Sequence, residues 1–183
     1  MLTRNIVLTL CALLCASLFL GCDDQKAPLV SAKNGFEIKL LSGESFDIRI
    51  EPSEARYNTL VLDQRGKKPV LFAFFTTICP ECAKEIPHLI DLKERYGESV
   101  DLLGVLVENR SAEEVADFVA FHQINYPVIV GAGAFRLADA VGGVRLIPAI
   151  HIYDDSGAYV THFVGPVPQE MLETRLNSLI KAN

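Results

Sequence analysis

Two cysteines, Cys79 and Cys82, carry the clearest chemical signal in the sequence, because they form a Cys-x-x-Cys pair after an apolar run. Pro80 between them suits the first turn of a helix, where its missing N–H is no loss. Cysteines at positions i and i+3 of a helix start have Cα atoms roughly 5–6 Å apart, within the range that a disulfide requires. The spacing therefore allows Cys79 and Cys82 to form one disulfide.

The start of a helix also favours ionisation of the Cys79 thiol, since unpaired N–H groups and the positive end of the helix dipole stabilise an anion. Thiolate is the attacking species in disulfide exchange. A structural disulfide and half of a zinc site stay open as alternatives. Zinc would need two further ligands at close spacing, and the four histidines are scattered without a second Cys-x-x-Cys. The pattern favours a redox-active dithiol, and we expect no bound metal.

Composition limits the other functions that the chain could have. Of the five cysteines, three lie near the N-terminus (Cys11, Cys15 and Cys22), so the pair stands alone in the body of the chain. A disulfide-stapled scaffold would carry more. The 183 residues are 50% hydrophobic and 22% charged, which suits one globular domain with a leader. The net charge is −6 and no Lys/Arg cluster could follow a phosphate backbone, so we expect no nucleic-acid partner.

The leader, residues 1–21, predicts a signal peptide. Arg4 precedes an uncharged apolar stretch that has the length of a signal-peptide core and is short for a spanning helix. The stretch ends in a glycine and Cys22, which resembles a bacterial lipobox and implies that Cys22 is lipidated. An uncleaved N-terminal anchor is the alternative. Both place the domain outside the cytoplasm, and Asp23 implies retention at the inner membrane.

The elements around the cysteine pair predict a βαβ unit. Residues 22–35 are polar and aperiodic, typical of a tether, and residues 36–183 form the expected domain. Residues 69–75 are nearly all apolar, which indicates a strand buried on both faces. Apolar residues at helical spacing predict a helix over 80–96, and residues 100–107 predict a second buried strand. The two strands and their helix make one right-handed unit.

Further elements are predicted on both sides of this unit. They are a β-hairpin over 36–40 and 46–50, a short strand at 60–62, a helix from the capping box at Ser111, a strand over 126–130, a helix over 134–141, a hairpin over 149–153 and 159–164, and a last helix over 169–182 with Met171 facing inward.

This order of elements resembles the thioredoxin fold, an α/β fold with a central mixed sheet flanked by helices, here with an N-terminal β-hairpin and a helix–strand insert. More narrowly, the chain resembles the membrane-tethered TlpA/ResA-type thiol–disulfide oxidoreductases. Three matches carry the resemblance: the redox motif Cys79-Pro80-Glu81-Cys82, the acidic Glu85 three positions further on, and Ile147-Pro148 before a strand, where the fold holds a cis proline.

The resemblance implies a role for each matched residue. Cys79 attacks or is attacked, and Cys82 resolves the mixed disulfide. Glu85 lies one turn beyond Cys82, where a partly desolvated carboxylate with a raised pKa relays the proton of that thiol. A cis Pro148 turns the chain against the dithiol and leaves the backbone of Ile147 free to pair with a substrate strand. The expected substrate contacts are Pro80, Glu81, Ile147 and Pro148.

Two residues depart from the family pattern on the expected docking surface. Ile78 stands where the family usually has tryptophan, and Ile147 is bulkier than many residues before the cis proline. The identity of the substrate is therefore open. Glu81 beside Cys79 is expected to raise the pKa of the thiol and to favour a reductant, with a potential nearer roughly −270 mV than about −120 mV.

The sequence thus predicts a tethered extracytoplasmic reductase of disulfides in other proteins, with no cofactor besides its redox-active disulfide. The resemblance implies apocytochrome c as one substrate and a membrane thiol protein as electron donor. A peroxiredoxin-type peroxidase is the rival enzyme. The Thr-x-x-Cys that ends at Cys79 matches its motif, but this sequence has Phe72 where that motif has a proline. A Sco-like copper-delivery protein is the rival without catalysis, although the cysteines here are one residue closer together.

Overall fold

The computed structural model describes residues 35–55, 57–63 and 65–181. The chain divides into two compact units, Met1–Ala32 and Lys33–Asn183, and all described residues belong to the second. The expected signal peptide, the lipidation of Cys22 and nearly all of the expected tether lie outside the described residues. Within the described ranges, no helix has both the length and the apolar character needed to cross a membrane.

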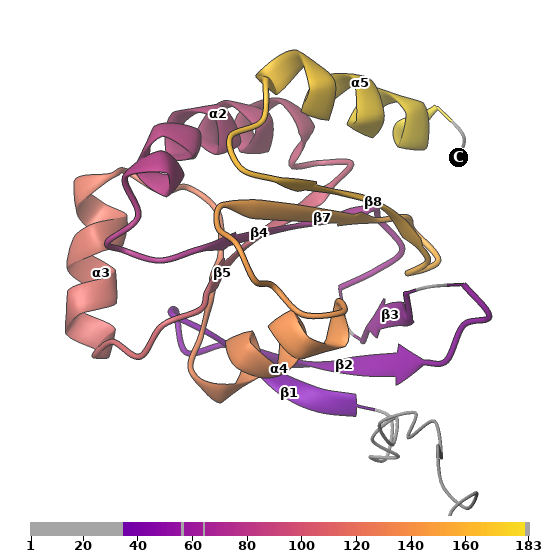
Figure 1. The fold of residues 1–183 in the computed structure, drawn as a ribbon, viewed down its shortest axis with the longest axis horizontal. Coiled ribbons are helices and arrows are strands. Elements are labelled where there is room, and N and C mark those ends of the chain that lie inside the picture. The colour runs from indigo at the N-terminus through magenta and orange to yellow at the C-terminus, as the bar shows by residue number, and fades with distance from the viewer. Residues whose placement is uncertain (1–34, 56, 64, 182–183) are drawn as a thin grey trace, which may run out of the picture. The chain divides into compact units, whose positions relative to one another are not determined.

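Eight strands of the described part form one mixed sheet in the order β3-β2-β1-β6-β5-β4-β7-β8 (Figure 1). The central pairs β4–β5 and β5–β6 are parallel, and every other pair is antiparallel. The strands are β1 (Gly35–Leu40), β2 (Ser45–Glu51), β3 (Thr59–Leu62), β4 (Val70–Phe75), β5 (Asp101–Leu106), β6 (Val128–Val130), β7 (Ala149–Tyr153) and β8 (Tyr159–Val164). Both expected hairpins and the βαβ unit are confirmed.

Four helices of the described part flank this sheet: α2 (Pro80–Tyr96), α3 (Ala112–Phe121), α4 (Ala132–Ala140) and α5 (Gln169–Ile180). The bounds of α2 match the predicted helix over 80–96, and α2 continues through an internal proline, Pro87. The expected capping box of α3 is present, with Ser111 as its N-cap. The inward position expected for Met171 is wrong, because α5 packs on the sheet through Leu172 and Leu176.

The two faces of the sheet bury different side chains of the same strands. All residues of β4 and β7 are buried. Ile150 and Ile152 of β7 pack toward α2 and α5, while Ala149 and Tyr153 join the core that contains α4. Figure 1 shows α2 and α5 together on one side of β4 and β7, and α4 on the other. Neighbouring residues of β7 therefore face two separate environments.

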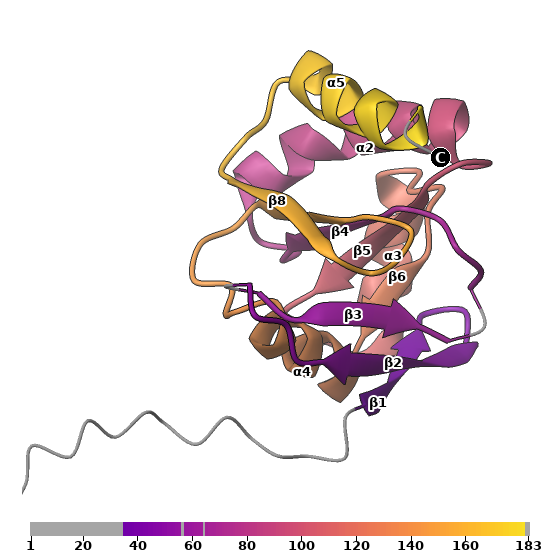
Figure 2. The ribbon, with the colours of Figure 1, turned by 90° about the vertical axis from the view of Figure 1, so that its right-hand side faces the viewer.

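The sheet curls until its two ends meet (Figure 2). The N–H of Leu60 in β3 donates a 2.8 Å hydrogen bond to the carbonyl of Gly157 in the β7–β8 turn, although β3 and β8 end the strand order on opposite sides. The rings of Tyr57 and Tyr159 pack beside this contact at 4.1 Å. Gly157 has φ +82°, and a Cβ there would lie 2.2 Å from the carbonyl oxygen of Leu60, so the closure requires glycine.

Candidate active site

The dithiol lies at the N-terminus of α2, where the sequence places it. Cys79 is the N-cap residue of α2, and Pro80 occupies the first turn. The N–H of Cys82 donates to Cys79 Sγ at 3.1 Å, so the sulfur takes the place that a capping oxygen usually fills. The two cysteines form a disulfide with a Cα–Cα separation of 5.2 Å. The expected Cys79–Cys82 pairing is therefore present.

The two sulfurs differ in their access to solvent. Cys79 is half-buried, whereas Cys82 is 2% exposed and packs among apolar side chains that include Phe75, Leu106 and Val115. A large partner can therefore reach Cys79 and is kept from Cys82. This asymmetry is the one expected for an attacking thiol and a resolving thiol.

Glu85 is buried behind the dithiol, with 3% of its surface exposed. Its Oε2 accepts a 3.4 Å hydrogen bond from the N–H of Val167, while Oε1 has no hydrogen-bond partner among the described residues. Burial raises the pKa of the Glu85 carboxyl, although the Val167 N–H and the charge of His88 partly oppose this effect. Glu85 and Cys82 line the same small cavity of about 10 Å³. The carboxyl can thus hold a proton near the resolving thiol.

The segment before β7 completes the site. The Ile147–Pro148 peptide bond is cis, as expected. Pro148 is buried and lines the small cavity with Cys82 and Glu85, and Ile147 packs against the apolar cluster that also contacts Cys79. Among the described residues, Ile147 has no backbone hydrogen bond, so its peptide groups can pair with another chain. The structure therefore brings the expected residues of α2 and of the segment before β7 together.

Glu81 forms an ion pair on the surface of α2. Its Oε1 lies 2.6 Å from Lys84 Nζ, and both side chains are exposed. The ammonium of Lys84 offsets the negative charge that was expected to act on Cys79. The effect of Glu81 on the pKa of the Cys79 thiol therefore stays a prediction.

Glu108 supports the loop before Cys79 and was missed by the sequence analysis. Its Oε1 accepts a 2.6 Å hydrogen bond from the N–H of Thr77, and its Oε2 lies 3.5 Å from Arg110 Nε. Glu108 follows β5, and β5 lies parallel to β4, which leads into the loop. The carboxyl ends of neighbouring parallel strands meet at one edge of a sheet, so this polar residue could have been connected with the loop from its position.

The described residues contain no group of three His, Cys, Asp or Glu side chains that could hold a metal ion. The two cysteines are joined to each other, and Glu85 is turned into the protein. The chemistry that this arrangement supports directly is thiol–disulfide exchange at Cys79, with a buried carboxyl lining the same cavity as Cys82.

Comparison with known proteins identifies the family. The profile of the redoxin family matches residues 47–180. The thiol–disulfide oxidoreductase ResA of Halalkalibacterium halodurans is 27% identical over 139 residues, which cover 75% of this chain and 69% of that protein. The thiol:disulfide interchange protein HelX of Rhodobacter capsulatus is 24% identical over 147 residues, covering 80% of this chain and 81% of HelX.

A solved structure confirms the fold. The crystal structure of StoA from Bacillus subtilis superimposes with a TM-score of 0.59 at 19% identity, covering 78% of this chain and 96% of StoA. The expected thioredoxin fold and the expected resemblance to TlpA/ResA-type proteins are both confirmed. The chain belongs to the redoxin family, as a thioredoxin-like thiol–disulfide oxidoreductase of the TlpA/ResA type.

Proposed function

We propose that this protein reduces disulfides in other proteins outside the cytoplasm through the Cys79–Cys82 dithiol. The observation that carries the proposal is the asymmetry of the two sulfurs, since Cys79 is accessible and Cys82 is enclosed. A structural disulfide would need neither this asymmetry nor a buried carboxyl beside the inner sulfur. The relatives named thiol–disulfide oxidoreductase and thiol:disulfide interchange protein support the same chemistry.

The reaction transfers two electrons in two displacements. The Cys79 thiolate attacks one sulfur of the substrate disulfide, forms a bond to it and releases the other substrate sulfur as a thiolate. The Cys82 thiolate then attacks Cys79 Sγ, re-forms the Cys79–Cys82 disulfide and releases the second substrate thiolate. The substrate gains two electrons and the protein loses them, so a thiol donor must return them before the next cycle. The disulfide itself is the redox group, and no other cofactor is needed.

Glu85 is proposed to move the proton of Cys82. The Cys82 thiol must lose its proton to attack, yet bulk water has little access to it. The Glu85 carboxyl lines the same cavity, and burial raises its pKa, which favours the protonated form that can give a proton to a nearby thiolate. Glu85 therefore acts as the local acid and base for the resolving step.

The location and the partners follow from the leader and the resemblance. We propose that residues 1–21 are removed and that Cys22 carries a lipid that holds the protein at the inner membrane. The electron donor would be a membrane thiol protein, and the substrate a protein with a reducible Cys-x-x-Cys disulfide, such as apocytochrome c. Mass spectrometry of the mature N-terminus tests the anchor, and an unmodified Cys22 would contradict it.

The decisive test of the reaction uses Cys82→Ser. Attack by Cys79 on a substrate disulfide should then stop at the mixed disulfide, because no second thiol remains to release it. The trapped species should appear as a covalent adduct on a non-reducing gel and disappear when reductant is added. Cys79→Ser is the matched control and should trap far less, since its remaining thiol is enclosed.

Identifying the adduct also separates the alternatives. A trapped protein with a Cys-x-x-Cys-His motif would support a role in cytochrome maturation, and a trapped copper protein would point to reduction of thiols at a metal site. Absence of an adduct from Cys82→Ser, together with peroxide consumption by the reduced wild-type protein, would replace the proposal by a peroxidase. Tight stoichiometric binding of Cu(I) would favour copper delivery.

A further inference from the structure

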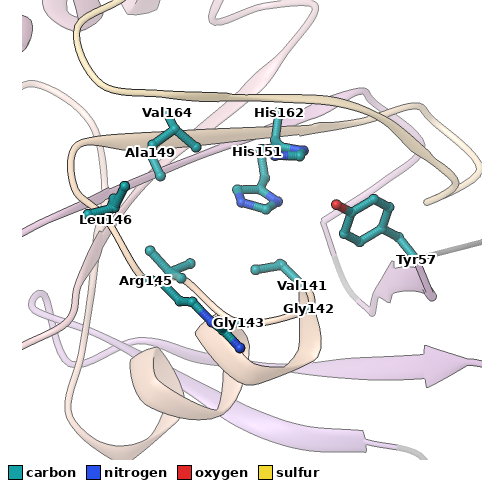
Figure 3. Close-up of a pocket in the computed structure, with 11 residues that line it drawn as sticks. Tyr57, Val141, Gly142, Gly143, Arg145, Leu146, Ala149, His151, His162 and Val164 are labelled. Atoms are coloured by element: carbon teal, nitrogen blue, oxygen red, sulfur yellow. The ribbon is translucent and has the colours of Figure 1, made fainter.

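A second cavity, of about 150 Å³, opens on the α4 side of the sheet (Figure 3). The loop after α4 supplies one wall, and the start of β7 with the end of β8 supplies the other. Figure 3 shows His151 reaching from β7 into the space between these walls, with Tyr57 closing one end. The chemistry of the Cys79–Cys82 dithiol uses none of these side chains.

His151 gives the cavity an unpartnered polar group. The side chain is 4% exposed, and its buried Nδ1 has no hydrogen-bond partner among the described residues. Burial lowers the pKa of His151 to about 4, with a smaller contribution from the charge of His162, so the ring is neutral at physiological pH. A buried polar group without a partner is costly, and an occupant with a hydroxyl group would remove this cost.

The neighbouring histidine is held in place by the protein. His162 lies opposite His151 across the β7–β8 ladder, and the two rings stack with centroids 5.0 Å apart. Nδ1 of His162 lies 2.7 Å from the hydroxyl of Tyr159. His162 is therefore fixed against His151, and of these two rings only that of His162 has a hydrogen bond to the described residues.

The remaining walls fit an aromatic ring beside a negative charge. Val141, Ala149 and Val164 supply apolar surface. An apolar protein cavity of about 150 Å³ is large enough to bind benzene. Arg145 borders the cavity, is exposed, and makes no ion pair within the described part of the chain. The guanidinium favours an anion at the rim and disfavours a metal ion between the two histidines.

The cavity adjoins the dithiol site through one short segment. Leu146 and Ala149 line the cavity and flank Ile147 and Pro148 on either side. Ile147 in turn packs against the apolar cluster that Cys79 contacts. A partner chain whose sulfur meets Cys79 and whose backbone pairs with Ile147 would therefore pass the mouth of the cavity. Leu146 and Val164 at this mouth are exposed apolar side chains.

We propose that this cavity receives a tyrosine side chain of the partner protein whose disulfide Cys79 attacks, with an acidic residue of the partner facing Arg145. The tyrosine ring packs on the apolar walls, and its hydroxyl bonds to His151. The inference rests on the proposed reductase function, because that function brings a partner chain to Ile147.

The test uses the reduced full-length protein in single turnovers and synthetic peptides that each contain one intramolecular disulfide. Tyrosine is placed in turn at the three positions on either side of the cysteine pair, with alanine or phenylalanine at the same position in matched peptides. At one position we expect the second-order rate constant for reduction of the tyrosine peptide to exceed that for the alanine peptide about tenfold. An aspartate beside the tyrosine should increase this ratio, and a lysine should decrease it.

Three variants assign the preference to the cavity. Val164→Trp should fill the mouth and bring the tyrosine-to-alanine ratio to about one. His151→Phe should bring the tyrosine-to-phenylalanine ratio to about one, because the ring contacts remain and the hydrogen bond is lost. Arg145→Glu should reverse the preference between aspartate and lysine. Met171→Trp is the matched control, because Met171 on α5 is 49% exposed and Val164 is similarly 53% exposed. This variant should keep the wild-type ratios.

Equal rates for tyrosine and alanine peptides at all six positions would overturn the proposal while the reductase function stands. Reduction of none of the peptides would instead contradict the reductase function, and the cavity proposal with it. A tyrosine preference that survives both Val164→Trp and His151→Phe would place the recognition elsewhere and also overturn the proposal.

Discussion

Glu85 and His151 lie on opposite sides of the same sheet, and each is a buried ionisable group with an unpartnered polar atom in the described part of the chain. Glu85 belongs to α2 and lies on the side of Ile150, whereas His151 belongs to β7 and points to the side of α4. Burial favours the neutral form of both groups. The same cause therefore raises the pKa of the acid and lowers the pKa of the base.

The two shifts have opposite consequences for stability. Between pH 6.5 and about pH 4, the unfolded chain binds a proton at His151 that the folded chain does not, so stability is lost as the pH falls. At Glu85 the folded chain holds a proton that the unfolded carboxyl has released, so stability is lost as the pH rises through the raised pKa. The comparison shows that each side of the sheet limits stability at a different end of the pH scale.

The largest expected effect concerns His151. Protonation of His151 should lower the free energy of unfolding by about 3 kcal/mol between pH 7 and pH 4. This is the energy that corresponds to a pKa lowered from 6.5 in the unfolded chain to about 4 in the folded chain. His151→Phe should remove this part of the pH dependence, as measured by urea unfolding at the two pH values. Met171→Phe is the control, since Met171 is 49% exposed on α5 and its replacement adds a phenylalanine without removing a histidine, so the pH dependence should match that of the wild type. If the free energy of unfolding of His151→Phe fell between pH 7 and pH 4 as much as that of the wild type, His151 would not limit stability at low pH.

The next effect concerns the rate of disulfide exchange. Glu85→Gln should lower kcat/KM for a disulfide peptide about tenfold and flatten its pH profile, because the amide cannot exchange a proton with Cys82. Glu94→Gln, an exposed position on the same helix, should leave both unchanged. A wild-type pH profile in Glu85→Gln would reduce Glu85 to a structural residue.

The same substitution should increase stability at high pH. Glu85→Gln keeps an acceptor for the Val167 N–H and removes the cost of a buried charge. We expect the free energy of unfolding to rise by about 1 kcal/mol at pH 8 and to change little at pH 4, where the wild-type carboxyl is already protonated. Equal changes at the two pH values would show that charge is not the cause.

The smallest effect is expected at Glu81, whose exposed carboxylate lies on α2. Glu81→Gln should change the rate of Cys79 alkylation at pH 7 by less than about twofold, because Lys84 offsets the charge of Glu81 and solvent screens the pair. Timed alkylation of the reduced protein measures this rate. A large acceleration would restore the original expectation that Glu81 opposes thiolate formation.

The sequence predicted those features of the fold that depend on local patterns. The proline after Cys79 and the apolar spacing up to Tyr96 defined α2, and alternation defined both hairpins. The dithiol followed from the spacing of its cysteines, whereas Glu85 was singled out by the family resemblance. Met171 was assigned wrongly because helical periodicity left the width of the buried face undefined, and α5 touches the sheet along a narrow stripe.

Features that depend on distant segments could not be predicted in this way. The hairpin that contains His151 and His162 was expected, but their pairing depends on a register that is shifted by an irregularity at Ile152 and Tyr153. The position of Tyr57 follows from a segment without periodicity. The burial of Glu85 depends on Val167, which lies 82 residues away in the sequence. These contacts require the order of strands, which local patterns do not specify.

The bond between Leu60 and Gly157 has a consequence for how the domain opens. The outer strands of a sheet usually fray first and exchange their amide hydrogens independently. Here the ends of the strand order are joined, so opening β3 requires the β7–β8 turn to release it. We expect the amides of both segments to exchange at similar rates and to respond together to Gly157→Ala. The two edge strands of the sheet, β3 and β8, would then act as one cooperative unit, although nearly a hundred residues separate them.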